Sequence, residues 1–210
     1  YLFCIARRMR IISFIRRSVF RIFLRRRIDL GVTSISSSSA INSIASSSVK
    51  MMGGVSNSFS SAPFERMAVS CFSFVTFERM LALFPEAEII ATLKCASQHF
   101  PVYKVRYHDV ELALYLSGVG APQCVGQQEE IYALGAECLV LFGTCGVLDR
   151  NIADCAIILT DAAMRDEGTS YHYAPPSDEI PVNVHHAGLF RSLLEELHVS
   201  CVNGKVWTTD

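Results

Sequence analysis

Two short segments of small residues follow apolar runs and could bind a ligand. The run that ends at Leu116 is followed by Ser117-Gly118-Val119-Gly120-Ala121-Pro122, and Leu139–Phe142 is followed by Gly143-Thr144-Cys145-Gly146. Glycine lets a backbone turn sharply and approach a bound molecule, and amide N–H groups ahead of a helix attract anions. The hydroxyl of Thr144 can both donate and accept a hydrogen bond. This chemistry suits a ligand that carries an anion or several hydroxyls.

A polar loop and the last residue supply further candidate groups. Arg165 could contact an anion, or it could form an ordinary ion pair with Asp166 or Glu167. His172 could reach a ligand hydroxyl or a neighbouring subunit. A carboxyl at Asp210 could act as a general acid only if burial raises its pKa. No histidine or helix start is placed to activate the thiol of Cys145, so we do not expect it to be a nucleophile.

The surrounding elements are typical of an α/β fold. Leu139–Phe142 is a continuous apolar run, as expected for a buried strand of an open sheet, which binds ligands beyond the carboxyl ends of its strands. The pattern also predicts a hairpin around His108-Asp109, a strand over 155–163 and a final strand over 199–208. Helices are predicted over 121–135, with residues 127–130 on its outer face, and over 185–197 with its leucines inward. The region 67–83 predicts a short helix or an incomplete strand, and 84–95 an entry segment.

Three sequence segments are more specific than the pattern. FGTCGVLD, AMRDEGTSYHYAPPSDE and GKVWTTD closely resemble the nucleoside phosphorylase family, in particular its uridine- and purine-phosphorylase-like members, and the resemblance covers about residues 101–210. It implies a three-layer α/β/α sandwich around a mixed central sheet. It also implies cleavage of an N-glycosidic bond by inorganic phosphate, with no metal or organic cofactor. Relatives assemble as homo-oligomers with sites near subunit contacts, so we expect the same of the complete protein.

The resemblance also assigns roles to residues. The turn that contains Ser117, Gly118 and Gly120 corresponds to the glycine-rich turn beside the nucleoside and phosphate. Thr144 stands where the family has a phosphate-contacting Ser or Thr. Cys145 and Gly146 stand at positions whose residues line the base and sugar in the family. Asp210 falls where purine phosphorylases carry the Asp that assists the departing base. Arg165 and His172 complete the predicted substrate-binding set.

The sequence departs from the family at three places. Leu141 replaces a phosphate-gripping arginine, so Arg165 or an arginine of a partner subunit would have to substitute, or the nucleophile is water. The family's N-terminal Gly-Asp-Pro turn is missing, with FPEAEIIATLK around its place. The chain stops before the Glu-Met-Glu segment that binds the ribose. We therefore expect a C-terminally truncated domain, poorly soluble and with little activity. A hydrolytic nucleosidase and a non-catalytic nucleoside-binding relative remain alternatives to a phosphorylase.

Composition divides the chain into two parts. Residues 1–62 are basic and then rich in serine, which predicts a disordered leader or non-native sequence; a transit peptide and a membrane-surface helix are the alternatives. Residues 62–210, with nine basic and 19 acidic residues, carry a formal charge of −10, which gives no support for nucleic-acid binding. The eight cysteines form no CxxC pair or zinc pattern, and no apolar run spans a membrane, so we expect a cytoplasmic, metal-free protein with its domain over 63–210.

Overall fold

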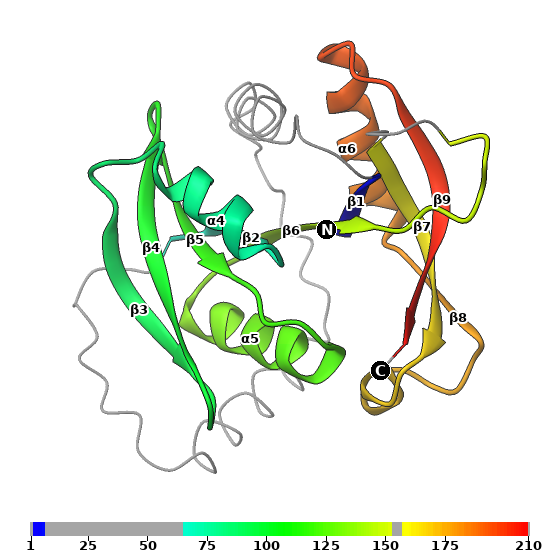
Figure 1. Ribbon diagram of the computed structural model, residues 1–210, viewed down its shortest axis with the longest axis horizontal. Coiled ribbons are helices and arrows are strands. Elements are labelled where there is room, and N and C mark those ends of the chain that lie inside the picture. The colour runs from blue at the N-terminus through cyan, green and yellow to red at the C-terminus, as the bar shows by residue number, and fades with distance from the viewer. Residues whose placement is uncertain (1, 7–64, 153–156, 210) are drawn as a thin grey trace.

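The computed structural model describes residues 2–6, 65–152 and 157–209 (Figure 1). Their strands form one sheet in the order β3-β4-β5-β2-β6-β1-β7-β8, and β9 also pairs with β7. The strands are β1 (Leu2–Ala6), β2 (Met67–Cys71), β3 (Glu88–Lys94), β4 (His99–Tyr107), β5 (Val110–Leu116), β6 (Cys138–Cys145), β7 (Ile157–Asp166), β8 (Glu179–Pro181) and β9 (Cys201–Thr209). The helices are α4 (Phe74–Leu81), α5 (Ala121–Leu134), the short 3-10 helix η2 (Thr169–His172) and α6 (Val184–Glu196).

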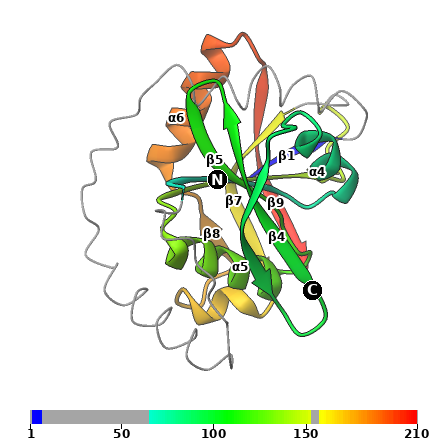
Figure 2. The same ribbon diagram turned by 90° about the vertical axis from the view of Figure 1, so that its left-hand side faces the viewer.

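The helices cover both faces of the sheet. On one face, Phe77 and Met80 of α4 and Phe190 of α6 pack with Val140 and Phe142 of β6. On the other face, Ile131 of α5 packs with the sheet residues Ala68, Tyr115 and Leu139. Figures 1 and 2 show α5 apart from α4 and α6, across the sheet. Since the sheet also mixes parallel and antiparallel pairs, the predicted α/β/α sandwich with a mixed sheet is confirmed.

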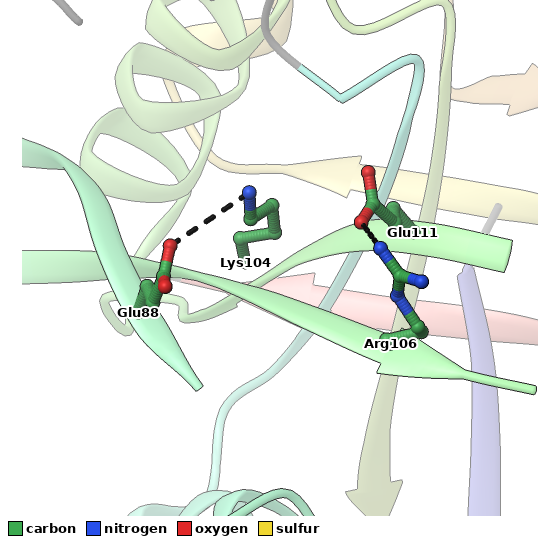
Figure 3. Close-up of polar contacts among 4 residues, drawn as sticks. All are labelled: Glu88, Lys104, Arg106 and Glu111. Atoms are coloured by element: carbon green, nitrogen blue, oxygen red, sulfur yellow. Dashed lines mark hydrogen bonds and ion pairs between the residues drawn. The ribbon is translucent and has the colours of Figure 1, made fainter. Parts of the chain in front are cut away.

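The first part of the sheet is an antiparallel arm, β3-β4-β5, in which the predicted hairpin is confirmed. Tyr107 pairs with Val110 around His108-Asp109, and His108 adopts a positive φ of 54° at the turn. Two cross-strand ion pairs follow this register on the arm (Figure 3): Lys104 with Glu88 at 3.7 Å, and Arg106 with Glu111. Both pairs are exposed, so they add little stability but agree with the register.

Helix α5 begins and ends where the sequence predicts. Pro122 stands in its first turn, and the N–H of Gly135 caps the C-terminus by donating to the carbonyl of Tyr132 at 3.1 Å. The prediction that Gln127 faces outward is wrong, because its side chain is only 5% exposed. Cys124, Gln127 and Ile131 form the buried face of the helix at helical spacing, and this period includes the glutamine.

Other boundaries differ from the sequence predictions. Residues 67–83 contain both a strand, β2, and a helix, α4, and the segment 84–95 contains β3. Strand β6 continues through Gly143, Thr144 and Cys145, which we expected to form a turn, because these residues pair with β1. Strand β7 and helix α6 agree with prediction, although Cys155 lies outside the described residues. Phe190 joins Leu193 and Leu194 on the buried face of α6.

Strand β1 lies within the predicted leader. It pairs in parallel with β6 and antiparallel with β7, and among the described strands β6 and β7 are connected only through it. Leu2–Ala6 thus form a strand whose backbone pairs with β6 on one side and with β7 on the other. The remainder of the leader lies outside the described residues. No helix in the described part of the chain has the length and apolar character needed to cross a membrane.

Candidate functional site

The two predicted small-residue segments lie at the same edge of the sheet. Strands β5, β2 and β6 are adjacent and parallel, and Leu116, Cys71 and Phe142 stand level in register. Gly118 comes two residues after Leu116, and Thr144 two residues after Phe142. Leu116 and Phe142 are themselves separated by two strand spacings, about 10 Å. The amide of Ser117 continues the sheet by donating to the carbonyl of Cys71 at 2.9 Å. The carboxyl ends of these strands thus bring both segments to one candidate site.

The turn after β5 is held by its own neighbours. The hydroxyl of Ser117, which is buried, donates to the carbonyl of Gly118 at 3.1 Å, and the amide of Gly118 donates to Oε1 of Gln127 at 2.7 Å. The expectation that every glycine amide of the turn is open to an anion is therefore wrong for Gly118. A Cβ at Gly118 would lie 2.4 Å from Cδ of Gln123, which would have to move.

The amides that remain in the turn precede α5. Gly120 has a φ of 96°, a conformation that glycine adopts without strain, and its carbonyl accepts the first helical bond from Cys124 at 3.0 Å. In the part of the chain that the structure describes, the amides of Val119 and Gly120 donate no hydrogen bond. They are the groups of this turn that could meet a ligand oxygen.

The end of β6 presents Thr144 to solvent and keeps Cys145 partly buried. Gly143 is close to Phe72, because a Cβ there would lie 3.0 Å from the phenyl ring. Among the described residues, none would meet a Cβ added at Gly146. Cys145 carries a free thiol. The exposed hydroxyl of Thr144 is thus the polar side chain that β6 offers at this edge.

Leu141 occupies the position at which the family carries a phosphate-binding arginine, and it has no charge to replace it. Leu141 is buried, and along β6 it shares a face with Leu139, on the side of the sheet covered by α5. Another cation lies at the same edge, and sequence reasoning missed it. Lys94 ends β3 and pairs in register with His99 of β4, its side chain is exposed, and β4 in turn pairs with β5, the strand that precedes the glycine turn. The signal for it was the strand β3, which the sequence did not predict.

Arg165 is buried and supports the polar loop. Its guanidinium donates to the hydroxyls of Ser170 (2.9 Å) and Ser177 (3.0 Å) and to the carbonyls of Pro175 (2.5 Å) and Ala174 (3.2 Å). It also lies 4.1 Å from the centre of the Tyr171 ring. These four acceptors are neutral, and within the described residues Arg165 forms no ion pair with Asp166 or Glu167, one of the two alternatives that the sequence left open. Asp166 instead accepts from the indole of Trp207 at 3.0 Å, and Glu167 accepts from the amide of Ser170 at 2.9 Å.

Arg165 and His172 are not brought to Thr144. Ile157, at the start of β7, is level with Thr144 across β1, and Arg165 comes eight residues later, on the order of 25 Å of strand. His172 is exposed at the end of η2. The loop is tied to α5 instead, since Tyr173 donates to Glu129 at 2.7 Å, and partial burial together with that carboxylate raises the pKa of Tyr173 to about 12. Asp210 lies outside the described residues.

Sequence similarity connects this chain with known proteins. A family model described as "Phosphorylase superfamily" matches residues 72–210, about two thirds of the chain. A guanosine phosphorylase from Halorubrum lacusprofundi is 25% identical over 96 residues, 46% of this chain and 38% of that protein. A uridine phosphorylase from Thermococcus kodakarensis is 28% identical over 95 residues, 45% of this chain and 33% of that protein. This chain therefore spans roughly a third of the length of these relatives.

A solved structure shares the fold. The purine nucleoside phosphorylase of Toxoplasma gondii, determined in complex with immucillin-H, superimposes with a TM-score of 0.60 at 19% identity. The superposition covers 70% of this chain and 58% of that chain. This similarity supports the α/β/α architecture, independently of the sequence segments.

Proposed function

This chain belongs to the phosphorylase superfamily, and we propose that the complete protein is a nucleoside phosphorylase. In this reaction an oxygen of inorganic phosphate attacks C1′ of the sugar while the bond from C1′ to the base nitrogen breaks. The base leaves with the bonding electrons and takes up a proton, and the products are the free base and ribose 1-phosphate. The reaction needs positioned donors for anionic oxygens and no redox chemistry, so we propose no metal or organic cofactor.

One observation carries the proposal at the level of the site. The glycine turn, with the amides of Val119 and Gly120, follows β5, and Thr144 lies near the end of β6; Leu116 of β5 and Phe142 of β6 stand level and about two strand spacings apart. Phosphate and a ribose together present oxygens over such a distance. Thr144 would hold phosphate, the turn would hold phosphate or sugar oxygens, and Cys145 and Gly146 would line the base and sugar. Lys94 is exposed two strands from β5 but four strands from β6, so we propose it only as a cation for oxygens near the glycine turn; an arginine of a partner subunit would have to substitute for the one that Leu141 lacks beside Thr144.

Further parts of the proposal concern the complete protein. Asp210 is proposed to assist the departing base, which requires its carboxyl to be protonated or hydrogen-bonded to the base. We propose homo-oligomers with sites near subunit contacts and a cytoplasmic location. For the choice of base, the names of the two relatives give guanosine and uridine as the first nucleosides to try.

A hydrolytic nucleosidase is the second candidate, and Leu141 is the observation that favours it. Without the arginine at this position the site has one cation fewer for phosphate, and water could act as the nucleophile. A nucleoside-binding protein without turnover is a third outcome.

The test is turnover of guanosine, uridine, inosine and adenosine by the complete protein, with and without inorganic phosphate. Phosphate-dependent release of base together with ribose 1-phosphate supports the proposal. Release of base and free ribose at the same rate without phosphate replaces it with a nucleosidase. Thr144→Ala should raise KM for phosphate about tenfold or more, as expected for a lost hydrogen bond to an anion. Thr92→Ala, at an exposed threonine of β3, serves as the matched control.

A further inference from the structure

Gln127 is a buried polar side chain that contacts the candidate site from behind. It lies on the inward face of α5, and Oε1 accepts the Gly118 amide at 2.7 Å. Its Nε2 atom is buried and has no hydrogen-bond partner among the described residues. The orientation of the amide follows from the partner, because a backbone N–H needs an acceptor and only the oxygen can supply one.

Packing alone does not account for a glutamine at this position. A buried donor without a partner costs free energy, and an apolar side chain of similar length would fill the same space without that cost. The favourable contact that glutamine gains is the bond to Gly118. The side chain therefore contributes at the turn rather than to the core of α5.

The bond fixes one end of the turn in a particular place. Gly118 is held by Gln127, and Ser117 before it is held by the carbonyl of Cys71. Gly120 after it starts α5 through the bond from Cys124. With both ends held, the amides of Val119 and Gly120 have little freedom to turn away from the edge that Thr144 shares. Preorganised donors of this kind bind an anion or a hydroxyl without a further ordering cost.

We infer that Gln127 is a positioning residue of the proposed nucleoside and phosphate site. It acts through Gly118 by holding the turn so that the Val119 and Gly120 amides face the ligand. The inference rests on the proposed function for its effect on substrate, whereas the link between Gln127 and Gly118 can be tested without any substrate.

Three variants of the complete protein test this inference. Gln127→Met keeps the length of the side chain and removes the acceptor, and Gln127→Glu keeps an oxygen facing Gly118. Gln128→Met is the matched control, since the neighbouring glutamine donates to the thiol of Cys124 and does not touch the turn. The first measurement is hydrogen exchange of the Gly118 amide. We expect exchange to be at least about tenfold faster in Gln127→Met, as follows from the loss of one hydrogen bond, and restored in Gln127→Glu.

The second measurement is steady-state kinetics. Gln127→Met should raise KM for phosphate or nucleoside about tenfold with kcat within about twofold, and Gln127→Glu should recover most of this loss. Unchanged Gly118 exchange in Gln127→Met overturns the inference. So does an unchanged KM for both substrates in a variant that has lost only stability, because Gln127 would then be structural. If no nucleoside is turned over by the wild type, the proposed function fails, and the exchange data still decide whether Gln127 holds the turn.

Discussion

Replacing Arg165 separates a structural role from a phosphate-binding role. The sequence suggested that this arginine could meet an anion, whereas the structure buries it beneath the 169–177 loop with four bonds to neutral acceptors. Arg165→Met removes the guanidinium and keeps much of the apolar stem that packs on Tyr171. We expect this variant to destabilise the protein and to leave the affinity for phosphate unchanged.

The magnitude follows from the bonds that are lost. Hydrogen bonds from a charged donor contribute about 1.5–3 kcal/mol each, but the loop is partly exposed, so its hydroxyls and carbonyls can bond to water instead. Among the described residues the arginine forms no ion pair, and its removal recovers some cost of burying a charge. A net loss of about 3 kcal/mol remains, equivalent to one or two such bonds. For a domain of this size, such a loss lowers the midpoint of thermal unfolding by about 6–12 °C.

The assay uses the single tryptophan of the chain. Trp207 donates to Asp166, the residue after Arg165, so its fluorescence reports on this part of the fold during thermal unfolding. Arg191→Met is the matched control, because Arg191 makes one exposed hydrogen bond, to Asn203, and should change the midpoint by less than about 2 °C. A rise in KM for phosphate of tenfold or more in Arg165→Met, with an unchanged unfolding midpoint, would refute the structural role of Arg165.

Three further predictions concern other parts of the described chain. Burial raises the pKa of the Cys71 thiol to about 11, so on raising the pH the thiol of the unfolded chain loses its proton before that of the folded chain. The free energy of unfolding should therefore fall by up to about 1.4 kcal/mol per pH unit between about pH 9 and pH 11. Cys71→Ala should flatten this part of a curve of unfolding free energy against pH. Leu141→Arg should destabilise the protein by about 3 kcal/mol or more in a denaturant titration, since it buries an unpaired charge, and unchanged stability with tighter phosphate binding would contradict this. Gly120→Ala should cost about 1–2 kcal/mol because φ is 96° there, whereas Gly126→Ala in the open interior of α5 should gain about 0.5–1 kcal/mol in the same titration.

Local patterns in the sequence predicted the elements whose hydrophobic period is regular. The hairpin around His108-Asp109 and the helix that ends at Gly135 were found with nearly correct bounds, because turn and cap residues mark them. Gln127 was assigned to the wrong face of that helix, because a polar residue is usually exposed and the bond that compensates its burial is made with a residue nine positions earlier. Residue type alone does not contain that contact.

Part of the candidate site was also predictable from local sequence patterns. The small-residue segments after β5 and β6 were recognised from their composition, and the parallel pairing of their strands with β2 places them together. Lys94 was missed because its strand, β3, reaches β5 only through the antiparallel strand β4. Arg165 was grouped with the site because its loop is rich in polar residues. Which polar residues share an edge depends on strand order and direction, and these are properties of the whole sheet.

The position of β1 in the sheet illustrates this dependence most clearly. Strands β6 and β7 run in opposite directions on either side of β1, and among the described strands only Leu2–Ala6 joins them. The end of β6 that carries Thr144 and Cys145 owes its extended conformation to pairing with Ile5 and Ala6, so the geometry of the candidate site depends on a strand far away in sequence. A motif centred on Gly143–Gly146 predicts a turn when considered alone. Because β1 occupies the neighbouring position, Gly143–Cys145 extend β6 instead, and Thr144 stands exposed near the end of that strand.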